Sequence, residues 1–337
     1  MKKILIALFL LLSVSIHSST TWAGVANLSL IEYPLALGNY LYVPEGQVVG
    51  VGYGIYSYDS DFESNNPTYE YDSEGSHTTF GYDVSLGESL LALNYKSFSS
   101  SSFSTLDYTN SSDSLIKDEM KSAGNLTTLG LLYAQHLGGE NYFYLAANSN
   151  KYKYEQDASI WSDGVLNSSS SYHNEREADW VSTVYGLTIG STFRFGASLQ
   201  PEVVAEVENS NFDSTTKTGH GEITTLGLGY QQESYQIELD QIELKKSEDF
   251  ISHYTEHSLN GQVMLSSNML LEANLAQRDV YDDEGPSYED TTQALAGIVK
   301  FSNLIIKCEA QHLTSYSVYS DYTMTLDILT LSLAGSF

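Results

Sequence analysis

Apolar and polar residues alternate with a period of two along most of the chain. In the segment 304–311, Leu304, Ile306 and Ala310 share one parity, whereas Lys307 and Glu309 share the other. This pattern indicates a β-strand whose two faces meet different surroundings, and helical periodicity is nearly absent. Beyond the N-terminal region there is no apolar run near the ~18 residues that a membrane-spanning helix needs. The pattern predicts an all-β fold.

About fourteen segments carry this alternation, and a number between twelve and sixteen is compatible with it. The expected strands lie near 47–59, 76–86, 89–99, 124–137, 141–154, 179–196, 201–212, 220–232, 235–247, 253–266, 269–281, 290–302, 304–317 and 321–337. Their connections alternate in length. Tight turns are expected at 87–88, 138–140, 196–200, 233–234, 266–268 and 302–303, and longer connections at 60–75, 100–123, 155–178, 211–219 and 282–290.

Short turns at one rim and long loops at the other are typical of transmembrane antiparallel up-and-down β-barrels. Two positions depart from simple alternation. In the segment 235–247 the apolar parity switches between Leu239 and Ile242, which indicates either a β-bulge or the rim of the barrel. Asp327 shares the parity of Leu329, so we expect it near the outer rim, where a charge is tolerated.

Tyrosines gather near the ends of the expected strands, among them Tyr53, Tyr56, Tyr133 and Tyr144. An aromatic girdle at the level of the lipid headgroups places tyrosine there, because its ring is apolar and its hydroxyl is polar. The high β-propensity of tyrosine predicts the same positions. Both interpretations stay open.

The N-terminus has the organisation of a secretory signal peptide. Lys2 and Lys3 precede a short apolar core, and Ala23 is the expected cleavage position. We therefore expect a signal peptide at 1–23 and a barrel at 47–337. Residues 24–46 are interpreted as a periplasmic segment, a partial plug or an additional strand.

At the other end, Leu329, Leu331 and Leu333 alternate with small or polar residues and the chain stops on Phe337. This resembles the terminal strand of bacterial outer-membrane proteins, although Gly335 stands where a larger residue is usual. The resemblance implies recognition by the barrel assembly machinery. It also implies a place in the outer membrane of a Gram-negative bacterium, with lipids and lipopolysaccharide as surroundings.

Composition excludes several classes of function. The formal net charge is −28, which opposes binding to nucleic acid, because phosphates are bound by clustered Lys and Arg. The single cysteine, Cys308, cannot form an internal disulfide. His136 and His312 are conceivable catalytic bases, but no nucleophile, metal-ligand or cofactor motif accompanies them. We expect no enzyme, no metal and no cofactor.

The parity opposite to the apolar one carries many charges, which a water-filled lumen can hold. The candidate pore-lining residues are Arg194, Glu202, Glu206, Glu272, Arg278, Lys300, Lys307 and Glu309. About fourteen strands leave room for an aqueous passage, whereas eight are filled by side chains. We therefore expect a porin-like channel for passive diffusion of small hydrophilic solutes. Its acidic residues favour cations.

Two alternatives remain. A surface interaction barrel with an occluded lumen would use the loops at 99–123 and 155–178 to bind a partner. A solitary autotransporter-like barrel would have twelve strands, with 24–46 threading the lumen as a remnant. The sequence determines neither the oligomeric state nor the solute.

Overall fold

The computed structural model describes residues 47–61, 68–86, 89–109, 115–138, 141–166, 172–189, 193–209, 217–232, 234–246, 253–282, 285–301, 303–318 and 323–336. The predicted all-β fold is confirmed. Within these residues no helix is long and apolar enough to cross a membrane. The strands are β1 (Gln47–Asp61), β2 (Thr68–Leu86), β3 (Ser89–Thr109), β4 (Leu115–Gly138), β5 (Asn141–Ser162), β6 (Val165–Leu166), β7 (Tyr172–Ile189), β8 (Phe193–Asn209), β9 (Lys217–Gln231), β10 (Tyr235–Lys246), β11 (His253–Ser266), β12 (Met269–Asp282), β13 (Gly285–Phe301), β14 (Leu304–Ser317) and β15 (Thr323–Ser336).

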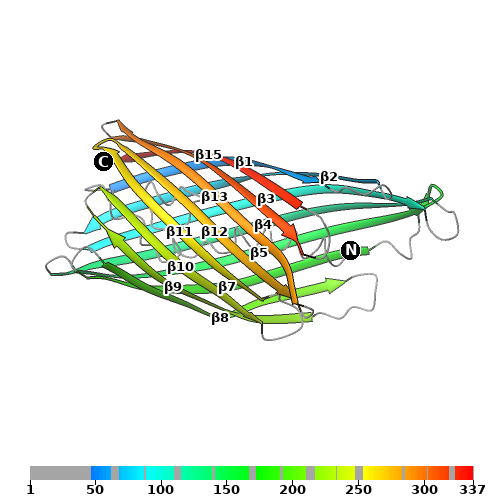
Figure 1. The fold of residues 1–337 in the computed structure, drawn as a ribbon, viewed down its shortest axis with the longest axis horizontal. Coiled ribbons are helices and arrows are strands. Elements are labelled where there is room, and N and C mark those ends of the chain that lie inside the picture. Colours follow the sequence, from blue (N-terminus) through cyan, green and yellow to red (C-terminus); the bar gives the residue numbers. More distant parts are fainter. Residues whose placement is uncertain are drawn as a thin grey trace.

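These strands form one closed barrel (Figure 1). Each barrel strand pairs antiparallel with its neighbours in the chain, and β1 pairs with β15 from Val48↔Ser336 to Asp61↔Thr323. The two-residue β6 only extends the end of β5, so fourteen of the fifteen described strands make up the wall. The predicted strand number is confirmed. The twelve strands expected of the autotransporter-like alternative are not what the structure has.

Four of the predicted long connections are mostly strand in the structure, namely 60–75, 100–123, 155–178 and 282–290. β3 and β4 stay paired from Ser89↔Gln135 to Thr109↔Leu115, so the connection expected at 100–123 is wrong. The segment 155–178 likewise belongs mainly to β5, β6 and β7. These parts extend past the lipid, where both faces of a strand are solvated and no apolar parity marks the strand. Their backbone hydrogen bonds nevertheless continue the ladder.

The hairpin between β7 and β8 turns earlier than the sequence predicts. The expected turn at 196–200 lies inside β8, and the chain turns between Ile189 and Phe193 instead. Leu187 pairs with Phe195, and both face outward. Because an odd number of residues separates β7 from β8, the outward apolar residues have the same parity in both strands. For this reason the sequence pattern predicted one continuous strand.

The wall is apolar outside and polar inside. Leu329 and Leu331 in β15 are 60% and 52% exposed, whereas Thr330 between them is 2% exposed. The same inversion recurs in the neighbouring strands, where exposed leucines alternate with buried Asn, Gln, Glu and Lys. A soluble protein buries its apolar parity, so this polarity belongs to a barrel with lipid around it.

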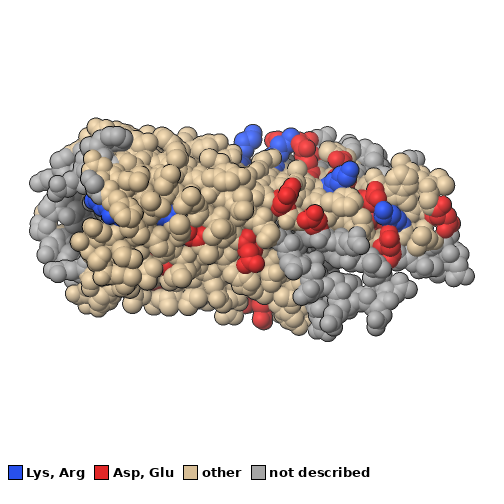
Figure 2. Space-filling model, turned by 90° about the horizontal axis from the view of Figure 1, so that it is seen from above, with Lys and Arg blue, Asp and Glu red and all other residues tan. Residues whose placement is uncertain are grey.

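The apolar outer band covers only part of the barrel's length. Figure 2 shows most charged side chains gathered over one half of the molecule, the half in which β2 to β5 reach beyond the shorter strands. Ion pairs join neighbours on this outer surface, including Lys153 with Glu155 (2.7 Å) and Glu175 (2.5 Å). The chain ends of the barrel, near Val48 and Ser336, lie at the opposite, short-turn rim. In outer-membrane barrels the short turns are periplasmic, so the extended half faces the cell surface.

The parity switch in β10 marks this boundary. Registers with β9 and β11 run without a break from Gln236 to Leu244, so the β-bulge interpretation is wrong. Outward apolar residues end at Leu239, and inward apolar residues begin at Ile242. The backbone alternates regularly while the solvent outside changes from lipid to water. The switch is therefore the rim of the membrane-embedded band.

Candidate functional site

The inner wall has an apolar and aromatic level on the cell-surface side of the membrane boundary, here called the upper apolar ring. Its inward side chains come from many strands and all are buried. They are Tyr56, Phe98, Leu126, Tyr152, Tyr154, Ile223, Ile242, Leu244, Tyr254, Val280, Tyr288, Leu313, Met324 and Leu326. The rings of Tyr56 and Phe98 stack with centroids 5.1 Å apart and planes 8° from parallel.

A glycine positions this stack. Gly75 in β2 pairs with Tyr56 in β1, and a Cβ on Gly75 would overlap the Tyr56 ring. The tyrosine ring therefore lies flat over the backbone of β2 and meets Phe98 of β3 beyond it. Close approach of this kind needs a residue without a side chain.

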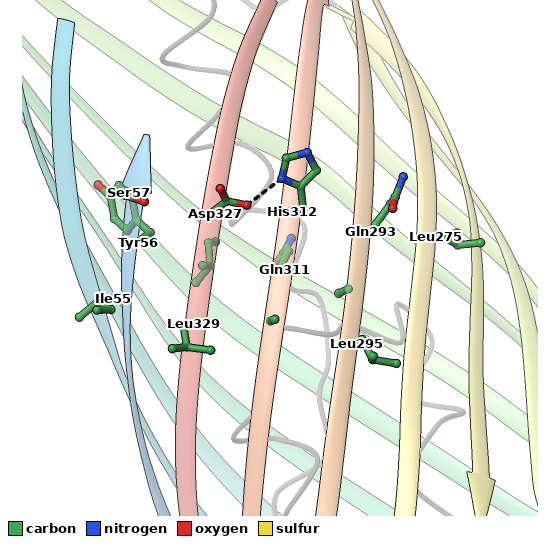
Figure 3. A pocket seen from close by; sticks show the side chains of 13 residues that line it. Ile55, Tyr56, Ser57, Leu275, Gln293, Leu295, Gln311, His312, Asp327 and Leu329 are labelled. Carbon is green, nitrogen blue, oxygen red and sulfur yellow. Dashed lines mark hydrogen bonds and ion pairs between the residues drawn. The ribbon is translucent and has the colours of Figure 1, made fainter. Parts of the chain in front are cut away.

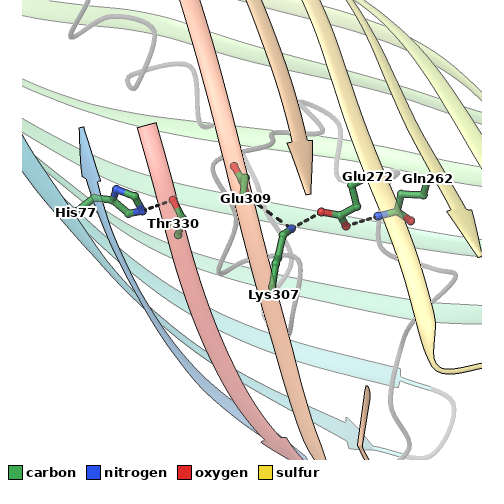
Figure 4. Close-up of polar contacts among 6 residues, drawn as sticks. All are labelled: His77, Gln262, Glu272, Lys307, Glu309 and Thr330. Carbon is green, nitrogen blue, oxygen red and sulfur yellow. Dashed lines mark hydrogen bonds and ion pairs between the residues drawn. The ribbon is translucent and has the colours of Figure 1, made fainter. Parts of the chain in front are cut away.

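Below the ring the inner wall is polar, and its network on β10 to β15 is here called the polar belt (Figure 4). Lys307 forms ion pairs with Glu272 and, at 3.8 Å, with Glu309. Gln262 Nε2 donates to Glu272 Oε1 at 2.8 Å. These contacts join side chains of β11, β12 and β14 into one connected group, in which the buried charges of β12 and β14 compensate one another.

The belt continues on both sides of this group. Asn260 Nδ2 donates to Asp240 Oδ2 at 3.0 Å, and Asn274 Nδ2 donates to Asn260 Oδ1 at 2.6 Å. On the other side His77 and Thr330 lie 3.2 Å apart, between Nε2 and Oγ1. Polar contacts at this level therefore involve β10, β11, β12, β14, β15 and β2.

At the short-turn rim the inner wall becomes apolar again. Val48, Leu270, Ile298, Ile305 and Ala334 form a buried cluster from five strands. The inner wall thus carries apolar residues above and below the polar belt. The upper apolar ring is interrupted by Glu256, Arg278 and Asp290, which the ladder places between Ile242 and Met324.

The candidate pore-lining residues divide into three groups. Glu272, Lys307 and Glu309 are brought together in the polar belt. Arg278 lies higher, where its Nε donates to Glu256 Oε2 at 2.8 Å and its guanidinium lies 4.8 Å from the centre of the Tyr254 ring. Lys300 lies toward the short-turn rim and is half-buried.

The other predicted residues are placed less fully. Arg194, Glu202 and Glu206 belong to β8, but their side chains lie outside the described part of the structure. Ala23, the segment 24–46 and Phe337 also lie outside the described residues. Leu329, Leu331 and Leu333 are on the lipid-facing surface.

The upper apolar ring was missed by sequence reasoning, although the parity switch at Ile242 was its signal. The tyrosines show the same ambiguity. Tyr53 and Tyr133 face outward as girdle residues do, whereas Tyr56 and Tyr144 are buried inward. Their parity relative to neighbouring leucines separates the two kinds once the strand register is known.

Comparison with known proteins gives further evidence on the fold. No family model matches the chain, and no curated protein matches it in sequence. Among solved structures, the toluene transporter TodX of Pseudomonas putida is similar with a TM-score of 0.57 and 12% identity, over 95% of each chain. The toluene transporter TbuX of Ralstonia pickettii has a TM-score of 0.55 and 10% identity, over 94% of this chain and 96% of that one.

A FadL homologue of Pseudomonas aeruginosa is also similar, with a TM-score of 0.55 and 8% identity over 95% of this chain and 96% of that one. At such identities the likeness concerns the fold. Together with the closed barrel and its apolar outer band, it identifies the chain as a fourteen-stranded outer-membrane β-barrel.

Proposed function

We propose that the protein is an outer-membrane channel for small solutes with an apolar body, such as monoaromatic compounds. The observation that carries this proposal is the upper apolar ring, which places aromatic and aliphatic side chains at the cell-surface end of the lumen. Transfer of apolar surface out of water is favourable by about 25 cal/mol per Å². A ring lined in this way concentrates apolar solutes at the entrance.

The ring's aromatic pair supports the same solute class. Tyr56 and Phe98 offer parallel faces at 5.1 Å. An aromatic solute adds to such a stack in an offset or edge-to-face arrangement, which contributes beyond its buried area. Similar barrels whose names refer to toluene or monoaromatic hydrocarbons add support at the level of the fold.

The polar belt argues against a wide, permanently hydrated pore. The side chains of Lys307 and Glu272 are 1% and 0% exposed. A general diffusion porin would present such charges to open water. Passage beyond the belt therefore requires side chains to rearrange, which suits a channel that binds its solute before releasing it.

The experiment uses cells of a porin-deficient Gram-negative host that carry the full-length protein. We expect faster uptake of toluene than in cells without it, and no gain in uptake of a small sugar. Phe98→Ser should abolish the gain, because Phe98 is 8% exposed and lies in the ring. Phe103→Ser is the matched control, because Phe103 is also a phenylalanine of β3 but is 40% exposed on the outer surface of the barrel. Equal loss in both variants, or no gain with toluene, would contradict the proposal.

A second candidate is the cation-preferring passage of hydrophilic solutes. The buried charged residues favour it because acidic side chains outnumber basic ones: Lys96, Arg278 and Lys307 against Asp83, Glu238, Asp240, Glu256, Glu272, Asp290 and Glu309. Acidic side chains attract cations in pores. Planar-bilayer recordings separate the two candidates, because a hydrophilic pore gives steady cation-selective conductance and a hydrocarbon channel gives little.

A further inference from the structure

His312 in β14 lies on the outer surface, at the upper limit of the lipid-facing band, and is held from both sides. Its Nδ1 is 2.7 Å from Asp327 Oδ1 in β15 (Figure 3). Because an ionised carboxylate only accepts hydrogen bonds, Nδ1 carries the hydrogen, and Nε2 of the neutral imidazole is an acceptor. Nε2 lies 3.1 Å from Thr314 Oγ1, so the hydroxyl of Thr314 donates to it. The three side chains therefore form one chain of hydrogen bonds, from hydroxyl to imidazole to carboxylate.

The strand register produces this order. His312 and Thr314 are two residues apart in β14, so their side chains point to the same, outward face. Asp327 is the ladder partner of His312 on β15, and Gln293 is its partner on β13. The sequence shows His312 as a conceivable base without a nucleophile motif. Its hydroxyl partner comes from the period of one strand, and its carboxylate comes from pairing with another.

An apolar pocket of about 530 Å³ opens on the outer surface directly below His312, toward the middle of the membrane (Figure 3). Its floor is Ala310, which lies between two ladder partners, Leu295 and Leu329, that are 58% and 60% exposed. The pocket therefore lies at the depth of a lipid acyl chain. His312 and Thr314 lie above it, at the depth of the ester that joins such a chain to its headgroup.

We propose that Thr314, His312 and Asp327 form the active site of an acyl-ester hydrolase that acts on lipids of the outer leaflet. A nucleophilic hydroxyl, a base that takes its proton and a carboxylate that orients the base recur together in hydrolases of unrelated folds. The substrate class is the ester of a long acyl chain, a linkage that glycerophospholipids and lipopolysaccharide share. The acyl chain lies in the pocket over Ala310, and its carbonyl carbon lies beside Thr314.

The reaction needs water as its only co-reactant. Thr314 Oγ1 forms a bond to the ester carbonyl carbon while its proton passes to His312 Nε2. The bond from this carbon to the alcohol oxygen breaks, and the leaving alcohol takes the proton from Nε2. Water then attacks the acyl-threonine ester and gives a proton to Nε2. The bond to Oγ1 breaks, Oγ1 takes that proton, and the fatty acid is released.

Two further side chains support these steps. Asp327 is a positioning residue, since it holds the imidazole of His312 in the tautomer that accepts at Nε2 and stabilises the imidazolium that forms. Gln293 lines the same pocket from β13, and its amide has two donors. We assign this amide to the negative charge that develops on the carbonyl oxygen.

The intact protein, refolded in detergent micelles, tests the proposal. Phosphatidylethanolamine and lipid A are supplied separately, and the released fatty acid is measured by mass spectrometry. We expect release from at least one of them, which also identifies the lipid. Thr314→Val keeps the shape but loses the hydroxyl and should lower the rate at least about 100-fold, whereas Thr314→Ser should keep activity. Thr325→Val is the matched control, because Thr325 is also an outward, half-buried threonine and pairs with Thr314 in the ladder.

The role of Asp327 has its own test. Asp327→Asn should lower kcat at least about 100-fold with little change in KM, because Asp327 orients His312 and does not touch the substrate. Asp157→Asn is the matched control, since Asp157 Oδ1 is also 2.7 Å from a histidine, at Nδ1 of His173, but does not line the pocket. An unchanged kcat in Asp327→Asn would show that the contact is only structural.

A fluorophosphonate probe gives a readout that does not depend on turnover. It should attach to Thr314, as located by peptide mass spectrometry, and attachment at any other residue contradicts the assignment. No fatty acid from either lipid, or equal release by the unchanged protein and Thr314→Val, overturns the proposal. Heat-modifiable migration in gel electrophoresis confirms that each variant is folded. Toluene uptake should be unchanged in Thr314→Val, which separates this proposal from the proposed function.

Discussion

Leu239 and Ile242 lie three residues apart in the same uninterrupted strand, yet Leu239 is 56% exposed and Ile242 is 2% exposed. Leu239 contacts the surroundings of the barrel and Ile242 the lumen. Lipid surrounds the outer wall at Leu239, so an outward apolar side chain avoids water there. Beyond Ile242 water surrounds the outer wall, so an apolar side chain avoids water by pointing into the lumen. The pair therefore places the membrane boundary between Leu239 and Ile242.

A charge on the lipid-facing side should destabilise the barrel according to its depth. Leu331→Arg places a guanidinium in the apolar band, and we expect a loss of about 2–4 kcal/mol in the free energy of unfolding. Thr325→Arg, on the same outward parity but above the band, should cost less than about 1 kcal/mol. Urea titration of the refolded protein in lipid vesicles measures both. Equal effects would contradict the position of the boundary.

Lys307 should be needed to compensate the carboxylates of the polar belt. Lys307→Met leaves Glu272 and Glu309 without their cation, and breaking a buried pair from one side costs about 3–5 kcal/mol. The double variant Lys307→Met/Glu272→Gln removes one of the uncompensated charges and should recover a good part of the loss. The same urea titration measures both variants, and we expect their effects on the free energy of unfolding to be non-additive. Full additivity would show that the contact contributes little.

Acid should loosen the extended hairpins at the cell-surface end. Hydrogen bonds to Glu155 and Glu175 raise the pKa of Lys153, and the bond from Lys153 lowers the pKa of Glu175. A carboxyl whose folded pKa is lowered stabilises the fold above its unfolded value, and this contribution is lost as pH falls through the folded pKa. Protonation of Glu175, which occurs below the ordinary range of a glutamate because its pKa is lowered, should therefore release the contact between β5 and β7.

Amide hydrogen exchange in β5 and β7 measures this effect at pH 6 and pH 3, after correction for the intrinsic exchange rates. Exchange should accelerate at the lower pH in the unchanged protein, and the pH dependence should be smaller in Lys153→Met. The shorter strands β12 and β14, which do not contain this ion pair, serve as the internal control. An unaltered pH dependence in Lys153→Met would contradict a role for the ion pair.

Gly75 should be sensitive to the smallest substitution. Gly75→Ala would push a methyl group into the Tyr56 ring and separate it from Phe98, at a cost of about 1–3 kcal/mol. Gly297→Ala is the control, because nothing lies within 4 Å of its added Cβ. Thermal unfolding followed by circular dichroism compares the two. If Tyr56 binds solute, Gly75→Ala should also slow toluene uptake; a neutral Gly75→Ala would refute the packing.

Much of the barrel could be read from single residues and their parity. Alternation such as that of Leu304 and Ile306 against Lys307 and Glu309 depends only on the two-residue period of the strand. It can therefore be recognised without knowing which strands are neighbours in the sheet. The strand number followed from it, and so did the short turns except the one expected at 196–200. The extended hairpins did not, because Ser99 to Ser102 present polar side chains to water on both faces and leave no parity to detect.

The site was less accessible to sequence reasoning. That Glu272, Lys307 and Glu309 carry charge on the inward parity was predictable, since each lies opposite to its apolar neighbours. That Lys307 joins them depends on the register between β12, β13 and β14, which is set by pairing across the sheet. The upper apolar ring combines residues from strands far apart in the chain, and only closure of the barrel brings them to one level.

The sequence by itself determined that the chain forms alternating strands with lipid on one side, because the solvent on each face acts on every residue separately. The sequence also indicated the membrane boundary, through the change of apolar parity between Leu239 and Ile242. Only the tertiary structure decided which residues face one another across the lumen. Such neighbours depend on register and closure, and a shift of two residues in one ladder would preserve every parity while changing every partner.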